Sequence, residues 1–272
     1  MTTLIDGKPG ESISILDRGF QYGDGIFETL AVANSEPLLW DRHLHRFLHG
    51  AARLSLKAPS VDLLRREAEQ VCRGNERGVL KIILTRGISG RGYAPNMDAA
   101  TTRAVSLLPW PDYPARLRTD GVNVQFCRNL ITRHPVLAGL KHLNRLEQIL
   151  ARMELKNGCA EGLMQDETGH IIEGTMTNIF IVSRGALLTP NLAHSGVDGV
   201  MRGLVLERAS TLSMDCRVTE LTREVILGAD EVFLTNSLIG VWPVCRVESK
   251  DYPVGRITRQ IQDAIRDATV AD

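Results

Sequence analysis

The chain has 272 residues, of which 43% are apolar, so it can bury one large core or two modest ones. Lysine plus arginine equals aspartate plus glutamate at 32 each, so no net field draws the protein to nucleic acid or to an anionic membrane, and no apolar run approaches the length that spans a bilayer. The five cysteines form no CxxC pair, which favours reduced thiols in the cytoplasm over a disulfide framework or a zinc site. The chain begins in polar sequence, so we expect no signal peptide.

A helix is predicted from about Asp41, in "DRHLHRFLHGAARL". The apolar positions that follow the helical period are Leu44, Phe47, Leu48, Ala51 and Leu54. His45 and His49 stand at i and i+4, a spacing that could hold a metal, but no acidic or cysteine ligand accompanies them, so we favour a solvated helix face and no metal. Arg46 in the same stretch is either an exposed charge or a phosphate clamp.

The next element, "GVLKIILTRG", is predicted to be a buried strand that ends in the glycine-rich loop "RGISGRGY". The glycines of this loop do not follow the G-x-G-x-x-G order of a dinucleotide site, and no Walker lysine follows them. Its two arginines and its tyrosine suit carboxylate recognition. A flexible surface loop is the alternative.

The stretch "LPWPDYP", residues 108–114, has three prolines and fits neither a helix interior nor a central strand. We interpret it as a stiff linker between a smaller N-terminal α/β domain, residues 1–107, and a larger C-terminal domain, residues 115–272. Strands and helices are mixed in both parts without the alternation of a doubly wound sheet, so the predicted class is mixed α/β, an α+β arrangement of two domains.

In the C-terminal part, Asn144–Asn157 is predicted to be a helix, with Asn144 and Glu147 as a capping box and Gly158 as its stop. "TNIFIVSRGALLTPN" predicts two strands joined by a tight turn at Arg184–Gly185. "GVMRGLVLERAS" opens a helix, and "DEVFLTNS" is a strand that ends in polar residues.

Several residues have both an ordinary and a chemical interpretation. Lys141 precedes a helix and is either a snorkelling surface lysine or a Schiff-base lysine. Glu173 is either a surface carboxylate or the partner of a heteroaromatic nitrogen. The loop "SGVDGVMR" is either a simple helix cap or a site where the amides of Val200 and Met201 bind an anion, and Ser237 beyond its strand could complete a phosphate cradle.

The order of these motifs is more specific than any one of them. "DRGFQYGDGIFET", "HLHRF", "TRGISGRGY", "GLKHLNRLEQ", "EGTMTNIF", "GVMR" and "VFLTNS" follow one another as in the fold-type IV pyridoxal-phosphate enzymes, and the chain resembles them along nearly its whole length. That family includes branched-chain and D-amino acid aminotransferases and 4-amino-4-deoxychorismate lyase. "LAGLKHLNRLEQ" and "TRGISGRGY" resemble the lyase branch in particular.

The resemblance implies that the cofactor is pyridoxal 5'-phosphate and that Lys141 is its Schiff-base lysine. Glu173 corresponds to the carboxylate at the pyridine nitrogen, and Asn178 to an asparagine near the cofactor. The positions that correspond to phosphate contacts are Arg46, the amides of Val200 and Met201, and Ser237. Met201 stands where relatives often have a threonine, so only its backbone N–H can serve there.

The resemblance also implies where the substrate lies. Arg91 and Tyr93 correspond to loop positions that contact a substrate carboxylate, and Tyr22 to a tyrosine that lines the pocket. Thr29 corresponds to a threonine near the substrate in the lyase branch, where branched-chain aminotransferases have glycine.

The activity implied is conversion of 4-amino-4-deoxychorismate to 4-aminobenzoate and pyruvate in folate biosynthesis, by a cytoplasmic homodimer. A D-amino acid or branched-chain aminotransferase of the same fold is the alternative. A cofactor-binding scaffold without activity is a third, disfavoured by the joint presence of Lys141, Glu173 and Arg46.

Overall fold

A computed structural model describes residues 2–269. The chain forms two compact units. The first unit comprises the residues up to Pro111 together with Leu140–Asn144, and the second comprises Asp112–Gly139 and the residues from Arg145 onward. Both mix helices and strands, which confirms the predicted α/β class. The return of the short segment Leu140–Asn144 to the first unit has no counterpart in the sequence-based prediction.

The first unit is built on an antiparallel sheet of six strands in the order β2-β1-β6-β5-β3-β4. The strands are β1 (Thr2–Ile5), β2 (Lys8–Pro9), β3 (Gly25–Ala33), β4 (Glu36–Pro37), β5 (Arg77–Thr85) and β6 (Thr102–Leu108). β5 is the strand predicted from "GVLKIILTRG", and the glycine-rich loop follows it as expected.

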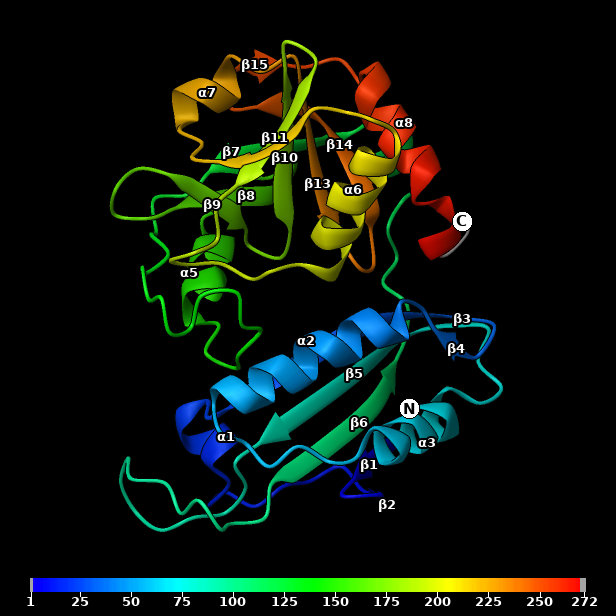
Figure 1. The fold of residues 1–272 in the computed structure, drawn as a ribbon, viewed down its shortest axis with the longest axis vertical. Helices are drawn as coiled ribbons and strands as arrows, with labels where there is room; N and C mark the ends of the chain where they lie inside the picture. The colour runs from blue at the N-terminus through cyan, green and yellow to red at the C-terminus, as the bar shows by residue number, and fades with distance from the viewer. Residues whose placement is uncertain (1, 270–272) are drawn as a thin grey trace. The chain divides into compact units, whose positions relative to one another are not determined.

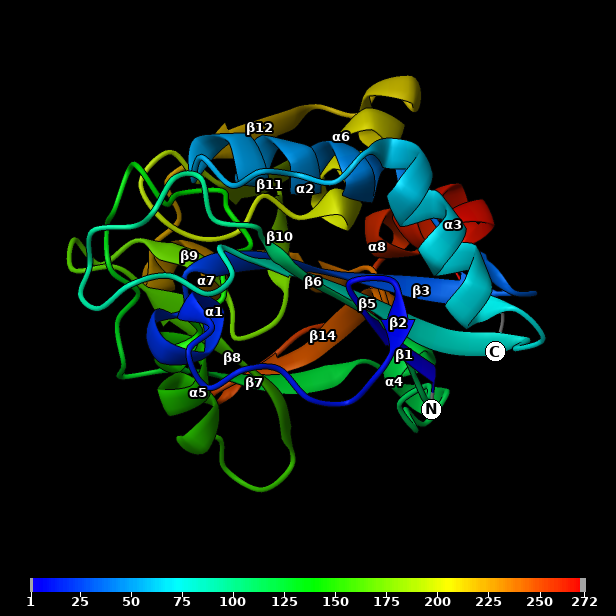
Figure 2. The ribbon, with the colours of Figure 1, turned by 90° about the horizontal axis from the view of Figure 1, so that it is seen from below.

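Three helices accompany this sheet: α1 (Arg18–Tyr22), α2 (Trp40–Arg53) and α3 (Val61–Cys72). α2 packs on β3 and α3 on β1 and β6 (Figure 2). α2 is the helix predicted from about Asp41 and begins one residue earlier. Phe47 and Ala51 of its apolar stripe are buried in the same core cluster as Ile26 and Leu30 of β3, so the helical period identifies the face that builds this core.

The second unit contains a nine-stranded mixed sheet in the order β12-β11-β10-β13-β14-β7-β8-β9, with β15 paired to β14. The strands are β7 (Val122–Phe126), β8 (Cys159–Gln165), β9 (Ile171–Gly174), β10 (Asn178–Ser183), β11 (Ala186–Pro190), β12 (Cys216–Thr219), β13 (Glu231–Asn236), β14 (Gly240–Val247) and β15 (Lys250–Asp251). The sheet curls, so that β9 also contacts β10. The predicted hairpin is present as β10 and β11. Arg184 and Gly185 both have positive φ, as a two-residue turn between antiparallel strands requires.

The helices of the second unit are α4 (Arg116–Thr119), α5 (Leu146–Met153), α6 (Val200–Thr211), α7 (Arg223–Leu227), α8 (Arg256–Ala264) and a 3₁₀ turn (Arg266–Ala268). α6 and α8 contact β13, and α8 also contacts β14 (Figure 1). The predictions of α6 and β13 are confirmed. Within residues 2–269 no helix is long and apolar enough to cross a membrane.

The predicted helix Asn144–Asn157 is only partly correct, because α5 covers Leu146–Met153. Its predicted capping box is wrong. The Asn144 side-chain amide donates to the carbonyl of Gly23 at 3.1 Å, and Glu147 accepts a hydrogen bond of 2.5 Å from the Thr132 hydroxyl. Gly158 occupies a left-handed turn before β8, after the helix has already ended. The two side chains that were predicted to cap the helix thus form hydrogen bonds with residues far from it in the sequence.

Candidate active site

Lys141 is held at the edge of β3 in the first unit. The Phe27 amide donates to the Lys141 carbonyl at 2.9 Å, and the Leu143 amide donates to the Gly25 carbonyl at 2.9 Å. Ile26 and His142 face each other in an antiparallel bridge between these bonds. The backbone around Lys141 therefore pairs with the start of β3 as a short additional strand segment. This pairing gives the Lys141 side chain a defined direction.

The Lys141 side chain lies over an aromatic ring. Its Nζ is 4.5 Å from the centroid of the Phe27 ring, within the range in which a ring face attracts a cation. Thr29 follows Phe27 by two residues on β3, and alternate residues of a strand point to the same face. Three side chains, those of Lys141, Phe27 and Thr29, thus belong to one face of this strand.

The opposite face of β3 carries Glu28, which is paired with α2. Its carboxylate accepts hydrogen bonds from Arg46 Nε at 2.8 Å and Arg46 Nη2 at 2.6 Å, and lies 2.7 Å from His43 Nδ1. Burial alone would raise the pKa of Glu28, but the charge and hydrogen bond of Arg46 and the hydrogen bond of His43 outweigh it and lower that pKa to about 2. Burial lowers the pKa of His43, so the imidazole is neutral and its Nδ1–H donates to the carboxylate.

Sequence reasoning identified Arg46 but missed Glu28 and His43. A signal for Glu28 was available, because it shares the buried face of β3 with Ile26 and Leu30. A carboxylate in an apolar row requires a cation as its partner. The pairing with α2 could not be read from sequence, because it depends on how the helix crosses the strand.

The loop after β5 carries Arg91 and Tyr93. The rings of Tyr93 and Tyr22 meet edge to face with their centroids 5.6 Å apart. Arg91 is exposed and makes no hydrogen bond or ion pair with another residue of the described range 2–269. The structure therefore brings Tyr22 and Tyr93 together and leaves the Arg91 guanidinium at the surface of the loop.

In the second unit, Glu173 belongs to β9 and is 4% exposed. Its Oε2 accepts a hydrogen bond of 2.7 Å from the Val197 amide. Gly196 makes this approach possible, since it has φ +82° and a Cβ there would lie 3.2 Å from Glu173 Oε2 and 2.7 Å from Ile172. The buried carboxylate is thereby fixed against the loop that precedes α6.

Asn178 fixes the same loop from β10. Its Nδ2 donates to the Val197 carbonyl at 2.9 Å, and a Cβ on Gly199 would lie only 1.9 Å from its Oδ1. Gly199 is the N-cap of α6, and no side chain among residues 2–269 caps the helix, so the amides of Val200 and Met201 start a helix suited to an anion. The Met201 side chain is buried, which leaves its backbone N–H as the group it can offer.

Ser237 follows β13 directly, in a turn that the Asn236 side chain organises. Asn236 Oδ1 accepts hydrogen bonds from the amides of Leu238 at 2.9 Å and Ile239 at 3.0 Å. The Asn236 amide group donates to the Met176 carbonyl at 3.1 Å. The position of Ser237 is thus set by both the strand and the segment between β9 and β10.

A second buried carboxylate that sequence reasoning missed organises that segment. Glu161 is fully buried and accepts hydrogen bonds from the Thr175 hydroxyl, from the Met176 amide at 3.2 Å and from the Thr177 hydroxyl at 3.1 Å. Arg152 supplies the opposite charge at 3.1 Å. Glu161 therefore fixes the connection between the strands that carry Glu173 and Asn178, a role without a sequence signal because its partners are mostly backbone and hydroxyl groups.

The two units each carry groups suited to covalent and acid–base chemistry. Within residues 2–269 no three His, Cys, Asp or Glu side chains gather into a set that could hold a metal ion. The chain instead offers a lysine whose backbone pairs with β3, a buried carboxylate in β9, and a helix start at α6 that no side chain of residues 2–269 caps. A lysine, a carboxylate and an anion site are the groups that an aldehyde-bearing, phosphorylated heteroaromatic cofactor requires.

Comparisons with known proteins point to the same chemistry. A family model described as amino-transferase class IV matches residues 25–247. The chain is 34% identical to the aminodeoxychorismate lyase of Vibrio harveyi over 263 residues, which are 95% of this chain and 97% of the relative. It is 27% identical to a putative branched-chain-amino-acid aminotransferase of Methanocaldococcus jannaschii over 97% of this chain and 93% of that protein. The crystal structure of 4-amino-4-deoxychorismate lyase from Pseudomonas aeruginosa is 44% identical and superposes with a TM-score of 0.94, covering 97% of this chain and 98% of that one.

Proposed function

The chain belongs to the amino-transferase class IV family, and on that premise we propose that it is a pyridoxal-phosphate-dependent carbon–oxygen lyase. Its substrate is 4-amino-4-deoxychorismate, and its products are 4-aminobenzoate and pyruvate. The observation that carries this proposal is the 44% identity to a lyase structure over nearly the whole length of both chains. The aminotransferase relative is matched over a similar length at a lower identity of 27%.

The residues of the chain fit pyridoxal phosphate. Lys141 would hold the cofactor aldehyde covalently, and the buried Glu173 would keep the pyridine nitrogen protonated. Arg46, the amides of Val200 and Met201, and Ser237 would bind the phosphate, with Asn178 supporting the loop before the helix. Bound in this way, pyridoxal phosphate supplies an electron sink for the substrate carbon that loses its proton.

Lys141 then performs the proton transfers. Its Nζ, when unprotonated, would take the proton from the amine-bearing ring carbon of the substrate. The bond from the ring to the enolpyruvyl oxygen breaks, the ring becomes aromatic, and the Lys141 ammonium returns a proton to the departing enolpyruvate, which becomes pyruvate. Thr29, on the same face of β3, would hydrogen-bond the amine or the leaving group.

One of the two substrate carboxylates is assigned to the loop after β5. An exposed Arg91 can receive it through two parallel hydrogen bonds. Tyr93 and Tyr22, which touch edge to face, would form the wall beside it. The aromatic pair gives the loop a rigid surface against which a flat ring can pack.

The protein is proposed to act in the cytoplasm, in folate biosynthesis, as a homodimer. All five cysteines are free thiols, as a reducing compartment allows. Large apolar side chains are exposed in the first unit at Ile15, Leu16, Phe20 and Ile88, and on α5 at Leu146, Ile149, Leu150 and Met153. Burial against a second copy would remove this apolar surface from water. Sedimentation equilibrium should give twice the chain mass of 30.0 kDa.

The deciding experiment supplies the purified, cofactor-loaded protein with 4-amino-4-deoxychorismate and measures 4-aminobenzoate and pyruvate in equal amounts. Transamination of D-alanine and of L-leucine serves as the comparison. Lyase turnover well above both transaminations is expected. Transamination without 4-aminobenzoate would replace the lyase by the aminotransferase alternative.

A further inference from the structure

Residues 86–101 connect β5 to β6, and the part that carries Arg91 and Tyr93 is exposed. Gly90 and Gly92 flank Arg91, and a Cβ on either would lie more than 4 Å from other atoms of the described chain. Glycines in open space allow many backbone conformations. A loop that presents a guanidinium to a substrate must therefore be fixed by groups outside itself.

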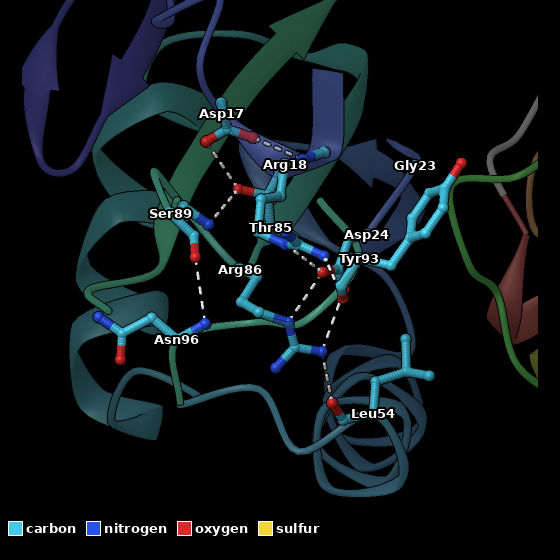
Figure 3. A network of polar contacts seen from close by, with 12 residues as sticks. Asp17, Arg18, Gly23, Asp24, Leu54, Thr85, Arg86, Ser89, Tyr93 and Asn96 are labelled. Carbon is cyan, nitrogen blue, oxygen red and sulfur yellow. Dashed lines mark hydrogen bonds and ion pairs between the residues drawn. The ribbon is translucent and has the colours of Figure 1, made fainter. Parts of the chain in front are cut away.

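Arg18 is such a group. Its side chain is only 5% exposed, and its Nη1 donates to the Gly92 carbonyl at 2.9 Å and its Nη2 to the Tyr93 carbonyl at 3.1 Å. Arg18 and Tyr93 are both drawn in Figure 3. These two carbonyls follow Arg91 directly in the chain. The Arg18 guanidinium carbon also lies 4.9 Å from the centroid of the Tyr22 ring, which packs against Tyr93. One buried side chain thus contacts both parts of the proposed carboxylate-binding wall.

The Arg18 side chain is itself held by the carboxylate of Asp24. Its Nε donates to Asp24 Oδ2 at 2.8 Å. Asp24 also accepts hydrogen bonds from Arg86 Nε at 2.8 Å and Nη2 at 3.0 Å, and Arg86 donates to the Leu54 carbonyl at 2.8 Å (Figure 3). Arg86 also donates to the Ser55 carbonyl at 3.1 Å, just beyond the end of α2. Burial alone would raise the pKa of Asp24, but the hydrogen bonds and charges of Arg86 and Arg18 outweigh it and lower that pKa.

We propose that Arg18, oriented by Asp24, is a positioning residue that sets the substrate affinity by holding the backbone of Gly92 and Tyr93. The proposal rests on the proposed function, because it requires Arg91 and Tyr93 to meet the substrate. The guanidinium uses three nitrogens in one plane, on one carboxylate and two carbonyls. A lysine ammonium keeps the charge but cannot reproduce this fixed fork.

The test compares Arg18→Lys with Arg65→Lys, a matched control on α3 whose ion pairs with Glu36 and Glu69 are exposed. Trypsin cleavage after Arg91, identified by mass, should be roughly tenfold faster in Arg18→Lys, because an ion-assisted anchor of the loop is lost. The KM for 4-amino-4-deoxychorismate should rise roughly tenfold with kcat within about twofold. Cofactor absorbance and melting temperature should match the control.

A double-variant cycle separates positioning from general destabilisation. If Arg18 acts through Arg91, the kcat/KM of Arg18→Lys/Arg91→Lys should equal that of Arg91→Lys alone. Multiplied losses would overturn the proposal, as would an unchanged cleavage rate in Arg18→Lys. If Arg18→Lys does not accumulate as folded protein, Asp24→Asn, which keeps an acceptor oxygen, replaces it in the cycle with Arg91→Lys. The expected result and the result that would overturn the proposal are then the same.

The outcomes also separate this inference from the proposed function. Faster cleavage after Arg91 with an unchanged KM would overturn the role of Arg18 in substrate affinity while lyase turnover by the wild-type protein still stands. Absence of lyase turnover in the wild type refutes the proposed function directly, and the cleavage rate then still reports whether Arg18 anchors the loop.

Discussion

Glu28 holds the guanidinium of Arg46 through two parallel hydrogen bonds, from Nε at 2.8 Å and from Nη2 at 2.6 Å. The Glu28 side chain is 2% exposed and that of Arg46 13%, so this pair is screened from water. His43 adds a third donor to the carboxylate. Arg46, the proposed phosphate ligand, is therefore oriented by its own protein before any anion arrives, and less of its side-chain entropy remains to be lost on binding.

Glu28→Gln should weaken cofactor binding. The amide keeps the shape of the side chain but loses the charge that directs the guanidinium, and a hydrogen bond to a charged group contributes about 1.5–3 kcal/mol. The dissociation constant of pyridoxal phosphate, titrated by its visible absorbance, should rise by roughly tenfold or more. Glu36→Gln, an exposed glutamate of β4, is the control. Equal affinities in the two variants would remove Glu28 from the support of Arg46.

The same carboxylate predicts a loss of stability in acid. The pKa of Glu28 is lowered from 4.5 to about 2 in the folded protein, so the unfolded state binds the proton more readily. Its stabilising contribution is fully present above pH 4.5 and is lost as the pH falls from 4.5 through 2. The free energy of unfolding from urea titrations should drop over this range in the wild type and less in Glu28→Gln. Parallel curves would contradict the assignment.

The contrast between two elements explains what sequence can predict here. The β10–β11 hairpin is determined locally, because Arg184 and Gly185 supply the positive φ of its turn and the apolar residues around them make the strands. The predicted helix at Asn144–Asn157 fails at its start, because Asn144 bonds to Gly23 and Glu147 to Thr132. Contacts at such sequence separations leave no periodic or capping signature.

The candidate site divides in the same way. Lys141, Glu173 and Arg46 stand in motifs whose order is readable in the chain, so they could be proposed from sequence. The residues that hold those motifs in place, such as Glu28 and Glu161, are buried carboxylates whose partners come from other elements. Their function follows from packing, and it becomes visible only when the strands and helices are assembled.

Lys141→Ala should abolish lyase turnover and leave the fold intact. No other side chain is proposed to bind the cofactor covalently or to move the protons, and loss of general acid–base catalysis alone typically costs about 10²–10⁴ in rate. The visible absorbance of the lysine-bound cofactor should disappear, while the melting temperature of the cofactor-free protein stays that of the wild type. Activity above about one hundredth of the wild type would contradict the assignment.

Glu173→Gln should retain the cofactor but slow the lyase. The amide can still accept the Val197 hydrogen bond of 2.7 Å, so the loop before α6 should keep its position. The pyridine nitrogen would lose its counter-charge, and the ring would accept electrons less readily. Single-turnover kinetics should show a lower rate with unchanged cofactor content. An unchanged rate would mean that Glu173 serves only to fix the loop.

Arg91→Lys should weaken substrate use without affecting the cofactor. Arg91 lies in an exposed loop with open space around its flanking glycines, and a planar guanidinium binds a carboxylate through two parallel hydrogen bonds that an ammonium cannot copy. The expected loss in kcat/KM corresponds to about 1.5–3 kcal/mol, the range for a hydrogen bond to a charged group. Arg217→Lys, an exposed arginine paired with Asp215 in the second unit, controls for the chemistry of the substitution. Wild-type kcat/KM in Arg91→Lys would show that the side chain points into solvent, whereas a loss of cofactor absorbance together with activity would assign Arg91 to the phosphate instead.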